Sequence, residues 1–293
     1  MFLTEEWSIQ NSHTMKYPIA MNTLVYGPDM NESIIQHLAY IKEVGYEGVE
    51  IPIFVVDQEY WKPWKAEIDR LGLSVFTVTF LGADMNTISS DPAVRQKGIN
   101  FLKKAVDITA YLGASYLSGP FHSALAVFSG AAPTQQELDW SKESMLAVAD
   151  HAKEKKVILG LEYLNRFENY VVSSADQLYS LVKAINHPNV KIMFDTFHAH
   201  IEEFNTGEAM VRIADEVGHI QLSESTRATL GEGQVHWDNV FTHLEKMNYK
   251  GWLVVEAFTP LLPAACIWRK NYTTEAELIL KSYQHIQKHL AGK

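Results

Sequence analysis

The chain has 293 residues, of which 47% are hydrophobic and 20% are charged, and its formal net charge at pH 7 is −10. This composition is typical of a globular protein with one large domain or two small ones. The acidic balance argues against nucleic acid as a partner, because it would repel a phosphate backbone. The one cysteine, Cys266, excludes an internal disulfide and a thiolate-rich metal site, which fits a reducing cytoplasm.

Residues 1–16 lack both a basic segment and a continuous apolar run. We therefore expect neither a signal peptide nor a membrane anchor, and no membrane partner. They are interpreted as an N-terminal extension that precedes one domain at residues 17–293.

From Tyr17 onward, short apolar runs alternate with amphipathic stretches. The runs predict eight strands buried on both faces. These are Ile19–Leu24, Gly48–Ile53, Ser74–Phe80, Ser115–Ser118, Val157–Leu161, Lys191–Phe194, His219–Leu222 and Trp252–Val255.

Helical patterns lie between the strands, and some carry clear end signals. Gly45 is suited to end a first helix, Asp91-Pro92 to begin another, and Thr134 with Glu137 to form a capping box. The expected helices are Asn31–Val44, Trp61–Leu71, Asp91–Leu112, one beginning at Thr134, Ser174–Ile185, Gly207–Val217, Trp237–Met247 and Thr274–Leu290.

Eight strand and helix units in about 275 residues match the length of a single (β/α)8 TIM barrel. No glycine fingerprint for a dinucleotide follows the first strand. An open doubly wound sheet remains the structural alternative, since strands and helices alternate in both folds.

Polar side chains with oxygen donors stand at the ends of strands five to eight: Glu162, Asp195, Gln221 and Glu256. In a barrel the carboxyl ends of the strands converge on one mouth, so these four should form an arc around one point. Carboxylates brought together would raise one another's pKa unless a cation neutralised them. The alternative is that they are solvated strand ends or partners of Arg166 and Arg227.

An oxygen-rich ligand set favours Mn²⁺, with Co²⁺ or Mg²⁺ possible, over structural Zn²⁺. A divalent metal is therefore the expected cofactor, and no organic cofactor is required.

Several segments of the second half resemble the ketose 3-epimerases of the D-tagatose and D-psicose (allulose) 3-epimerase family, which belong to the xylose-isomerase-like barrels. The first half matches mainly in layout. The matching segments are Leu161-Glu-Tyr-Leu-Asn-Arg-Phe-Glu168, Phe194-Asp-Thr-Phe-His-Ala-His-Ile-Glu-Glu203, Gly218-His219, Arg227 with Gly231-Glu-Gly233, and Val255-Glu-Ala-Phe258.

The resemblance implies that Glu162, Asp195 and Glu256 bind the metal and that Glu162 and Glu256 also exchange protons with a sugar. It implies further that Glu168, His198 and Arg227 hold substrate oxygens. Each of these three residues also has a structural role as its alternative. His198 could be a polar residue with its hydrogen bonds satisfied beside the strand, Glu168 could pair with Arg166 or cap the following helix, and Arg227 could be an ordinary cation in a loop.

The chain departs from the family at strand seven, where His-x-His is replaced by His219-Ile-Gln221. Strand alternation puts both side chains on one face, with Gln221 nearer the mouth. The amide oxygen of glutamine can bind a hard cation, and the chain resembles hydroxypyruvate and oxo-tetronate isomerases in having glutamine there. The other interpretation is that Gln221 bonds inside the barrel.

The function expected from these residues is a metal-dependent epimerase that inverts C3 of a free ketose through an enediolate. Aromatic residues at the strand ends, Phe80, Phe121, Phe197 and Phe258, are candidates to line the sugar pocket or to pack the barrel. The family resemblance suggests a homodimer or homotetramer.

Three alternatives use the same fold. An aldose–ketose or hydroxypyruvate-type isomerase would move the proton between C1 and C2, and a noncatalytic homologue would bind sugar without exchanging protons. A DNA-repair nuclease would be expected to have more histidine ligands and a basic face, and the negative charge argues against it.

Overall fold

The computed structural model describes residues 17–291, so the expected extension at residues 1–16 lies outside the described residues. Its strands form a closed parallel barrel in chain order, with β8 pairing back onto β1. The strands are β1 Ile19–Asn22, β2 Gly48–Pro52, β3 Ser74–Val78, β4 Tyr116–Gly119, β5 Ile158–Glu162, β6 Val190–Asp195, β7 Val217–Ser223 and β8 Leu253–Glu256. The predicted (β/α)8 barrel is therefore confirmed, and the open-sheet alternative is wrong.

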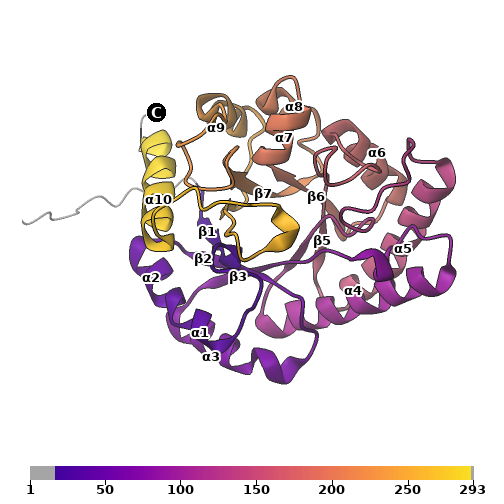
Figure 1. Ribbon diagram of the computed structural model, residues 1–293, viewed down its shortest axis with the longest axis horizontal. Helices are drawn as coiled ribbons and strands as arrows, with labels where there is room; N and C mark the ends of the chain where they lie inside the picture. The colour runs from indigo at the N-terminus through magenta and orange to yellow at the C-terminus, as the bar shows by residue number, and fades with distance from the viewer. Residues whose placement is uncertain (1–16, 292–293) are drawn as a thin grey trace, which may run out of the picture.

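Helices surround the strands on the outside of the barrel (Figure 1). They are α1 Glu32–Ile35, α2 His37–Val44, α3 Lys62–Leu71, α4 Pro92–Leu112, α5 Gln135–Glu154, α6 Ala175–Ile185, α7 Thr196–Glu202, α8 Thr206–Arg212, α9 Trp237–Lys246 and α10 Glu275–Ala291. Short 3-10 turns add η1 Thr23–Tyr26, η2 Gln58–Trp61, η3 Ala83–Met85 and η4 Pro263–Ala265. Among the described residues, no helix combines the length and the apolar character that crossing a membrane requires.

The predicted helix ends are confirmed where they rested on capping chemistry. The Ala93 amide donates to Asp91 Oδ1 over 2.8 Å at the start of α4. Thr134 and Glu137 form the reciprocal capping box of α5. Gly45 ends α2 with φ of +118°, a conformation in which a side chain is strained.

Two predicted helices needed correction, and one helix was missed. The helix expected at Asn31–Val44 is divided into α1 and α2. The helix expected at Gly207–Val217 spans Thr206–Arg212 instead, and Val217 already pairs with Ile192 as the first residue of β7. The short helix α7 was not predicted. It begins directly after β6, and Asp195 caps it by accepting a hydrogen bond from the Phe197 amide over 2.8 Å.

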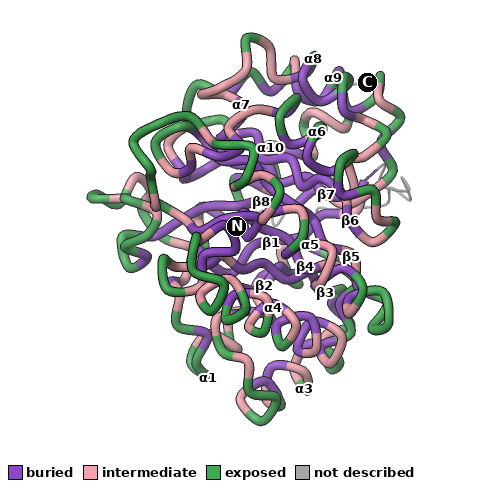
Figure 2. The backbone as a smooth tube through the Cα atoms, turned by 90° about the vertical axis from the view of Figure 1, so that its right-hand side faces the viewer, coloured by how far each residue is buried: buried purple, intermediate pink, exposed green. Residues whose placement is uncertain are grey.

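The interior of the barrel is layered. An aromatic group of Phe76, Tyr116 and Trp252 packs together inside the amino-terminal end of the barrel. Most strand residues are buried, and most exposed residues lie on the surrounding helices and loops (Figure 2). Polar side chains above the aromatic group therefore meet in a space that water does not reach from below.

Candidate active site

The four residues predicted as an arc lie at the carboxyl ends of neighbouring strands. Glu162, Asp195 and Glu256 are the last residues of β5, β6 and β8. Gln221 lies opposite Asp195 in the ladder between β6 and β7. Because parallel strands in a barrel end at one mouth, the strand register alone brings these groups together.

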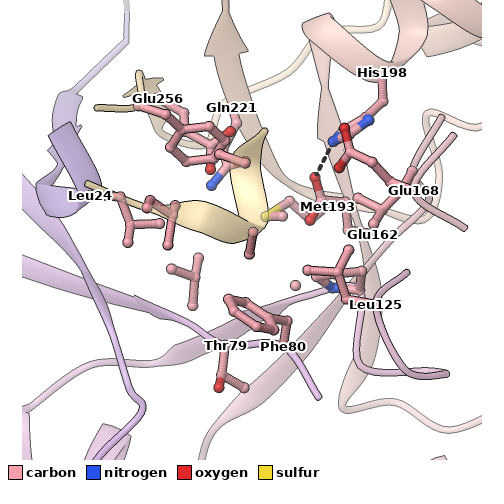
Figure 3. A pocket seen from close by; sticks show the side chains of 18 of the residues that line it. Leu24, Thr79, Phe80, Leu125, Glu162, Glu168, Met193, His198, Gln221 and Glu256 are labelled. Atoms are coloured by element: carbon pink, nitrogen blue, oxygen red, sulfur yellow. Dashed lines mark ion pairs between the residues drawn. The ribbon is translucent and has the colours of Figure 1, made fainter. Parts of the chain in front are cut away.

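A pocket opens at this mouth (Figure 3). Its polar lining includes all the predicted site residues except Asp195, which is joined to them through Arg227. The opposite wall is apolar and includes η4 from the segment after β8. The pocket is lined by Glu162, Glu168, His198, Gln221, Arg227, Glu256 and Thr79 on the polar side, and by Leu24, Phe54, Val78, Phe80, Phe258, Leu262, Ala264 and Ala265 among the apolar residues.

The four aromatic candidates divide into two pairs. Phe80 and Phe258 line the pocket, whereas Phe121 and Phe197 are not among the lining residues. Phe121 is buried in the core. Phe197 instead packs on the guanidinium of Arg227, whose Cζ lies 3.7 Å from the ring centroid.

Arg227 is the positive charge at the centre of the acidic cluster. Its Nη1 donates to Asp195 Oδ2 over 2.7 Å and to Glu256 Oε2 over 2.6 Å. The residue is 4% exposed, and its backbone has φ of +55°. Arg227 is therefore a direct partner of Asp195 and Glu256, as the alternative expected for the carboxylates. Its guanidinium lies between these two carboxylates, where a cation would bind.

The carboxylates raise one another's proton affinity. Burial, followed by the charges of Glu256 and Asp195, raises the pKa of Glu162 well above its ordinary value. Burial also raises the pKa of Glu256 well above that value and raises the pKa of Asp195, although Arg227 opposes both shifts. One arginine thus does not fully neutralise the cluster, and a divalent cation would do so more completely.

His198 lies beside two of the carboxylates, and Glu162, Asp195 and His198 are close enough to hold a metal ion as a group. However, the backbone amide of Asn165 donates to His198 Nδ1 over 3.0 Å. In a neutral imidazole the proton must then sit on Nε2, which lies 3.5 Å from both Glu162 Oε1 and Asp195 Oδ2. Burial and the charge of Arg227 lower the pKa of His198, which favours that neutral form.

This tautomer determines whether His198 Nε2 can bind a metal or donates a hydrogen bond. A nitrogen that carries a proton donates hydrogen bonds and cannot bind a metal, so the geometry favours a donor to substrate oxygens over a fifth ligand. It also makes the 2.9 Å contact between His198 Nε2 and Arg227 Nη2 a meeting of two donors. One donor group of Arg227 therefore faces another donor instead of an acceptor.

Gln221 is fully buried and has one free end. Its Nε2 donates to Glu50 Oε2 over 2.6 Å, while Oε1 has no hydrogen-bond partner among the described residues. Buried polar atoms are normally paired, so an unpartnered oxygen beside three carboxylates is the atom that a hard cation would complete. The donor set of Glu162, Asp195, Gln221 and Glu256 fits a divalent metal that prefers oxygen.

Glu168 does not pair with Arg166, as one alternative proposed. Its Oε1 accepts from Asn165 Nδ2 over 2.8 Å, and Arg166 pairs instead with Glu202. Glu168 thus remains at the pocket wall beside His198 (Figure 3). Glu162 and Glu168 are therefore two carboxylates of the predicted site that form no ion pair with a lysine or arginine among the described residues.

Sequence reasoning missed three residues that support the site. Asn165 fixes the ring of His198, and Asn22 and Glu50 lie inside the barrel next to Gln221. A signal existed for Glu50, because a carboxylate in the middle of an otherwise apolar strand needs a partner. No comparable signal distinguished Asn165 from the other residues of its motif.

Comparison with known proteins places the chain in a family. The family model of xylose isomerase-like TIM barrels matches residues 38–282. The chain is 30% identical to the ketose 3-epimerase of Arthrobacter globiformis over 253 residues, which cover 84% of this chain and 87% of the relative. It is 27% identical to the L-ribulose 3-epimerase of Methylomonas sp. (strain DH-1) over 263 residues, or 85% and 89% of the two chains.

A solved structure gives the same result. A crystal structure of D-allulose 3-epimerase from Methylomonas sp. matches this fold with a TM-score of 0.88 and 25% identity, covering 93% of this chain and 98% of that one. The chain therefore belongs to the xylose isomerase-like TIM barrel family and, within it, to the ketose 3-epimerase group of isomerases.

Proposed function

We propose that the protein is a divalent-metal-dependent epimerase that inverts C3 of a free ketose. The observation that carries this proposal is the pair Glu162 and Glu256, two buried carboxylates with raised pKa at one pocket. A carboxylate whose pKa is raised toward neutrality is suited to accept a proton and to return one. The relatives named as 3-epimerases of ketoses support the same chemistry.

The two glutamates have the placement that inversion needs. They lie at the ends of β5 and β8, with β6 and β7 between them, so they approach the pocket from different sides. One carboxylate takes the proton from C3, and the other, which begins protonated, returns its proton on the opposite face. The roles reverse in the back reaction. Before another forward turnover, proton exchange with water must return the first carboxylate to its ionised form and the second to its protonated form.

Glu162, Asp195, Gln221 and Glu256 would hold the metal. When bound, the cation supplies Lewis-acid polarisation of the substrate carbonyl and so stabilises negative charge that develops there. Mn²⁺ is the first candidate, with Co²⁺ and Mg²⁺ next, because the proposed ligands are oxygen atoms. Loss of protons from the carboxylates favours binding, so the affinity for metal should rise with pH.

The remaining polar residues would orient the sugar. His198 Nε2–H is a donor and Glu168 is an acceptor, and both face the pocket. Arg227 is the only lysine or arginine among the described residues that line the pocket, and two carboxylates already pair with it. A phosphate group would find only this one cationic side chain in the described lining, which favours an unphosphorylated substrate.

The decisive experiment is incubation with a panel of free ketoses in D₂O with Mn²⁺, followed by NMR. An epimerase places deuterium at C3 and produces the C3 epimer. An aldose–ketose or hydroxypyruvate-type isomerase would instead produce an aldose or aldehyde with exchange at C1 or C2. A noncatalytic sugar-binding protein would show line broadening of a bound sugar without deuterium incorporation.

Metal dependence is tested on the same reaction. Prolonged chelation should abolish deuterium incorporation, and Mn²⁺ or Co²⁺ should restore it. Full activity in protein that elemental analysis shows to be free of divalent metal would refute the proposed chemistry.

A further inference from the structure

Glu50 is a fully buried carboxylate in the middle of β2 that is not among the residues lining the pocket. Asn22 Nδ2 and Gln221 Nε2 each donate to its Oε2 over 2.6 Å. His219 Nε2 lies 2.7 Å from its Oε1. Glu50 therefore collects three donors from β1 and β7, although it has no direct access to a substrate in the pocket.

The bond to Glu50 determines which way the Gln221 amide points. A carboxylate oxygen only accepts, so the amide must turn its NH₂ toward Glu50. Oxygen and nitrogen are nearly equal in size, and without this partner the amide could rotate by half a turn. The rotated amide would present a donor to the cation, which is repulsive.

Glu50 is itself held in place from several sides. Asn22 Oδ1 accepts from the Leu24 amide over 2.8 Å, which fixes its Nδ2 toward Glu50. Asn22 and Glu50 also lie opposite each other in the ladder between β1 and β2. His219 packs against the rings of Phe76 and Tyr116, with centroids 5.1 and 5.8 Å away.

We infer that Glu50 is a positioning residue, which orients the carboxamide of Gln221 so that Oε1 faces the metal. The inference rests on the proposed function, because it requires a metal at the mouth. A glutamine ligand depends on such a partner more than a carboxylate does, since only one of its two ends can bind a cation. Loss of a partner of this kind typically weakens metal binding by about 10 to 100-fold.

The test is a double-mutant cycle read by titration calorimetry with Mn²⁺. It compares the unmodified protein, Glu50→Met, Gln221→Leu and the double variant. Methionine has no oxygen to accept from Gln221, so Glu50→Met should raise the metal Kd by about 10-fold or more, as expected for a lost orienting partner. In the Gln221→Leu background the same change should alter the Kd less than about 2-fold, because no amide remains to be oriented.

The cycle separates orientation from charge. Glu50→Met also removes a negative charge, and that electrostatic loss would weaken metal binding by the same factor in both backgrounds. Equal factors in the two backgrounds would overturn the inference. Glu216→Gln is the matched control: it makes the same change in charge just before β7, at the end of the strand away from the mouth, and should leave the Kd unchanged.

A second measurement needs no variant that might fail to fold. In protein labelled with ¹³C and ¹⁵N at glutamine, the side-chain NH₂ of Gln221 should be protected from solvent exchange. Adding Mg²⁺ should shift its carbonyl carbon and leave the NH₂ protected. Loss of protection on binding, or an unmoved carbonyl carbon, would contradict the inference.

The two proposals fail in different ways. If the unmodified protein binds Mn²⁺ and Glu50→Met binds it equally well, only the role of Glu50 is refuted. If the unmodified protein binds no divalent metal, the proposed metal-dependent function falls, and the role of Glu50 falls with it.

Discussion

Replacing Arg227 with methionine tests whether this residue takes the place of the cation in the metal-free protein. Its guanidinium bonds Asp195 and Glu256 and is 4% exposed. Methionine keeps much of the length and the apolar stem. It has a Cβ as arginine does, so the strain of the backbone at φ +55° is unchanged.

The magnitude follows from the burial of the pair. Removing one partner of a buried ion pair typically destabilises a protein by about 3–5 kcal/mol, because charges are left uncompensated. We therefore expect that loss in the free energy of unfolding of the metal-free variant. If metal displaces the guanidinium from the carboxylates, the metal-bound form loses mainly the contacts with Phe197 and Phe258, worth about 1–2 kcal/mol.

By linkage, the difference between these two losses appears as tighter metal binding. The difference is about 1 kcal/mol or more, and about 1.4 kcal/mol corresponds to a tenfold change in Kd, so Arg227→Met should bind Mn²⁺ at least about fivefold more tightly. The assay is urea unfolding with chelator and with excess Mn²⁺, together with a metal titration. Arg166→Met is the control, since Arg166 pairs with Glu202 away from the pocket and should give a small, equal loss in both conditions.

The result that would refute this reasoning is an equal or larger loss of stability with Mn²⁺ than with chelator. In that case Arg227 would stay with the carboxylates and assist the metal rather than replace it.

Three further predictions concern the proton carriers, the metal preference and a buried histidine. Glu162→Gln and Glu256→Gln should each slow epimerisation at least about 10²-fold, the lower range for a general acid or base; near-normal rates in both would place the proton carriers elsewhere. Gln221→His should keep a working site but shift the relative affinity, measured by titration, toward Co²⁺ and Zn²⁺ over Mn²⁺, and an unchanged preference would contradict the ligand assignment. Burial lowers the pKa of His122 from 6.5 to about 4, so its contribution to stability is complete above pH 6.5 and is lost as the pH falls toward 4. In metal-free protein the free energy of unfolding should therefore fall by about 2 kcal/mol more between pH 6.5 and 5 than in His122→Gln, and equal slopes in urea titrations would show that His122 is not buried in its neutral form.

The fold could be predicted from the sequence because buried parallel strands are continuous apolar runs. Each predicted strand is present, and the errors lie at the ends. The predicted strands stopped before Asp195 and Ser223 because these residues are polar, but they are the last residues of β6 and β7. Strand ends at the mouth can be polar because they contribute side chains to the site. The helix α7 was missed because Asp195 begins it as well as belonging to the site.

The site was predictable as far as it depends on strand ends. The barrel brings Glu162, Gln221 and Glu256 to one pocket whatever the loops do. The position of Arg227 was not predictable in this way, because it lies in a loop with a left-handed backbone and its contacts depend on that conformation. The tautomer of His198 likewise depends on a single backbone amide, that of Asn165.

Glu50 shows how much further the sequence could have been used. Its contact with Gln221 joins β2 to β7 across 171 positions of the chain, and no periodicity in either strand indicates which strands will meet. Hydrogen-bond chemistry narrows the choice, however. A buried carboxylate can only accept, so the interior of the barrel must supply donors to it, and Asn22, His219 and Gln221 are interior side chains that can donate. A buried acceptor in the middle of a strand therefore predicts that its partners are donors. Because Gln221 donates its NH₂ to Glu50, its amide oxygen remains available to bind a cation.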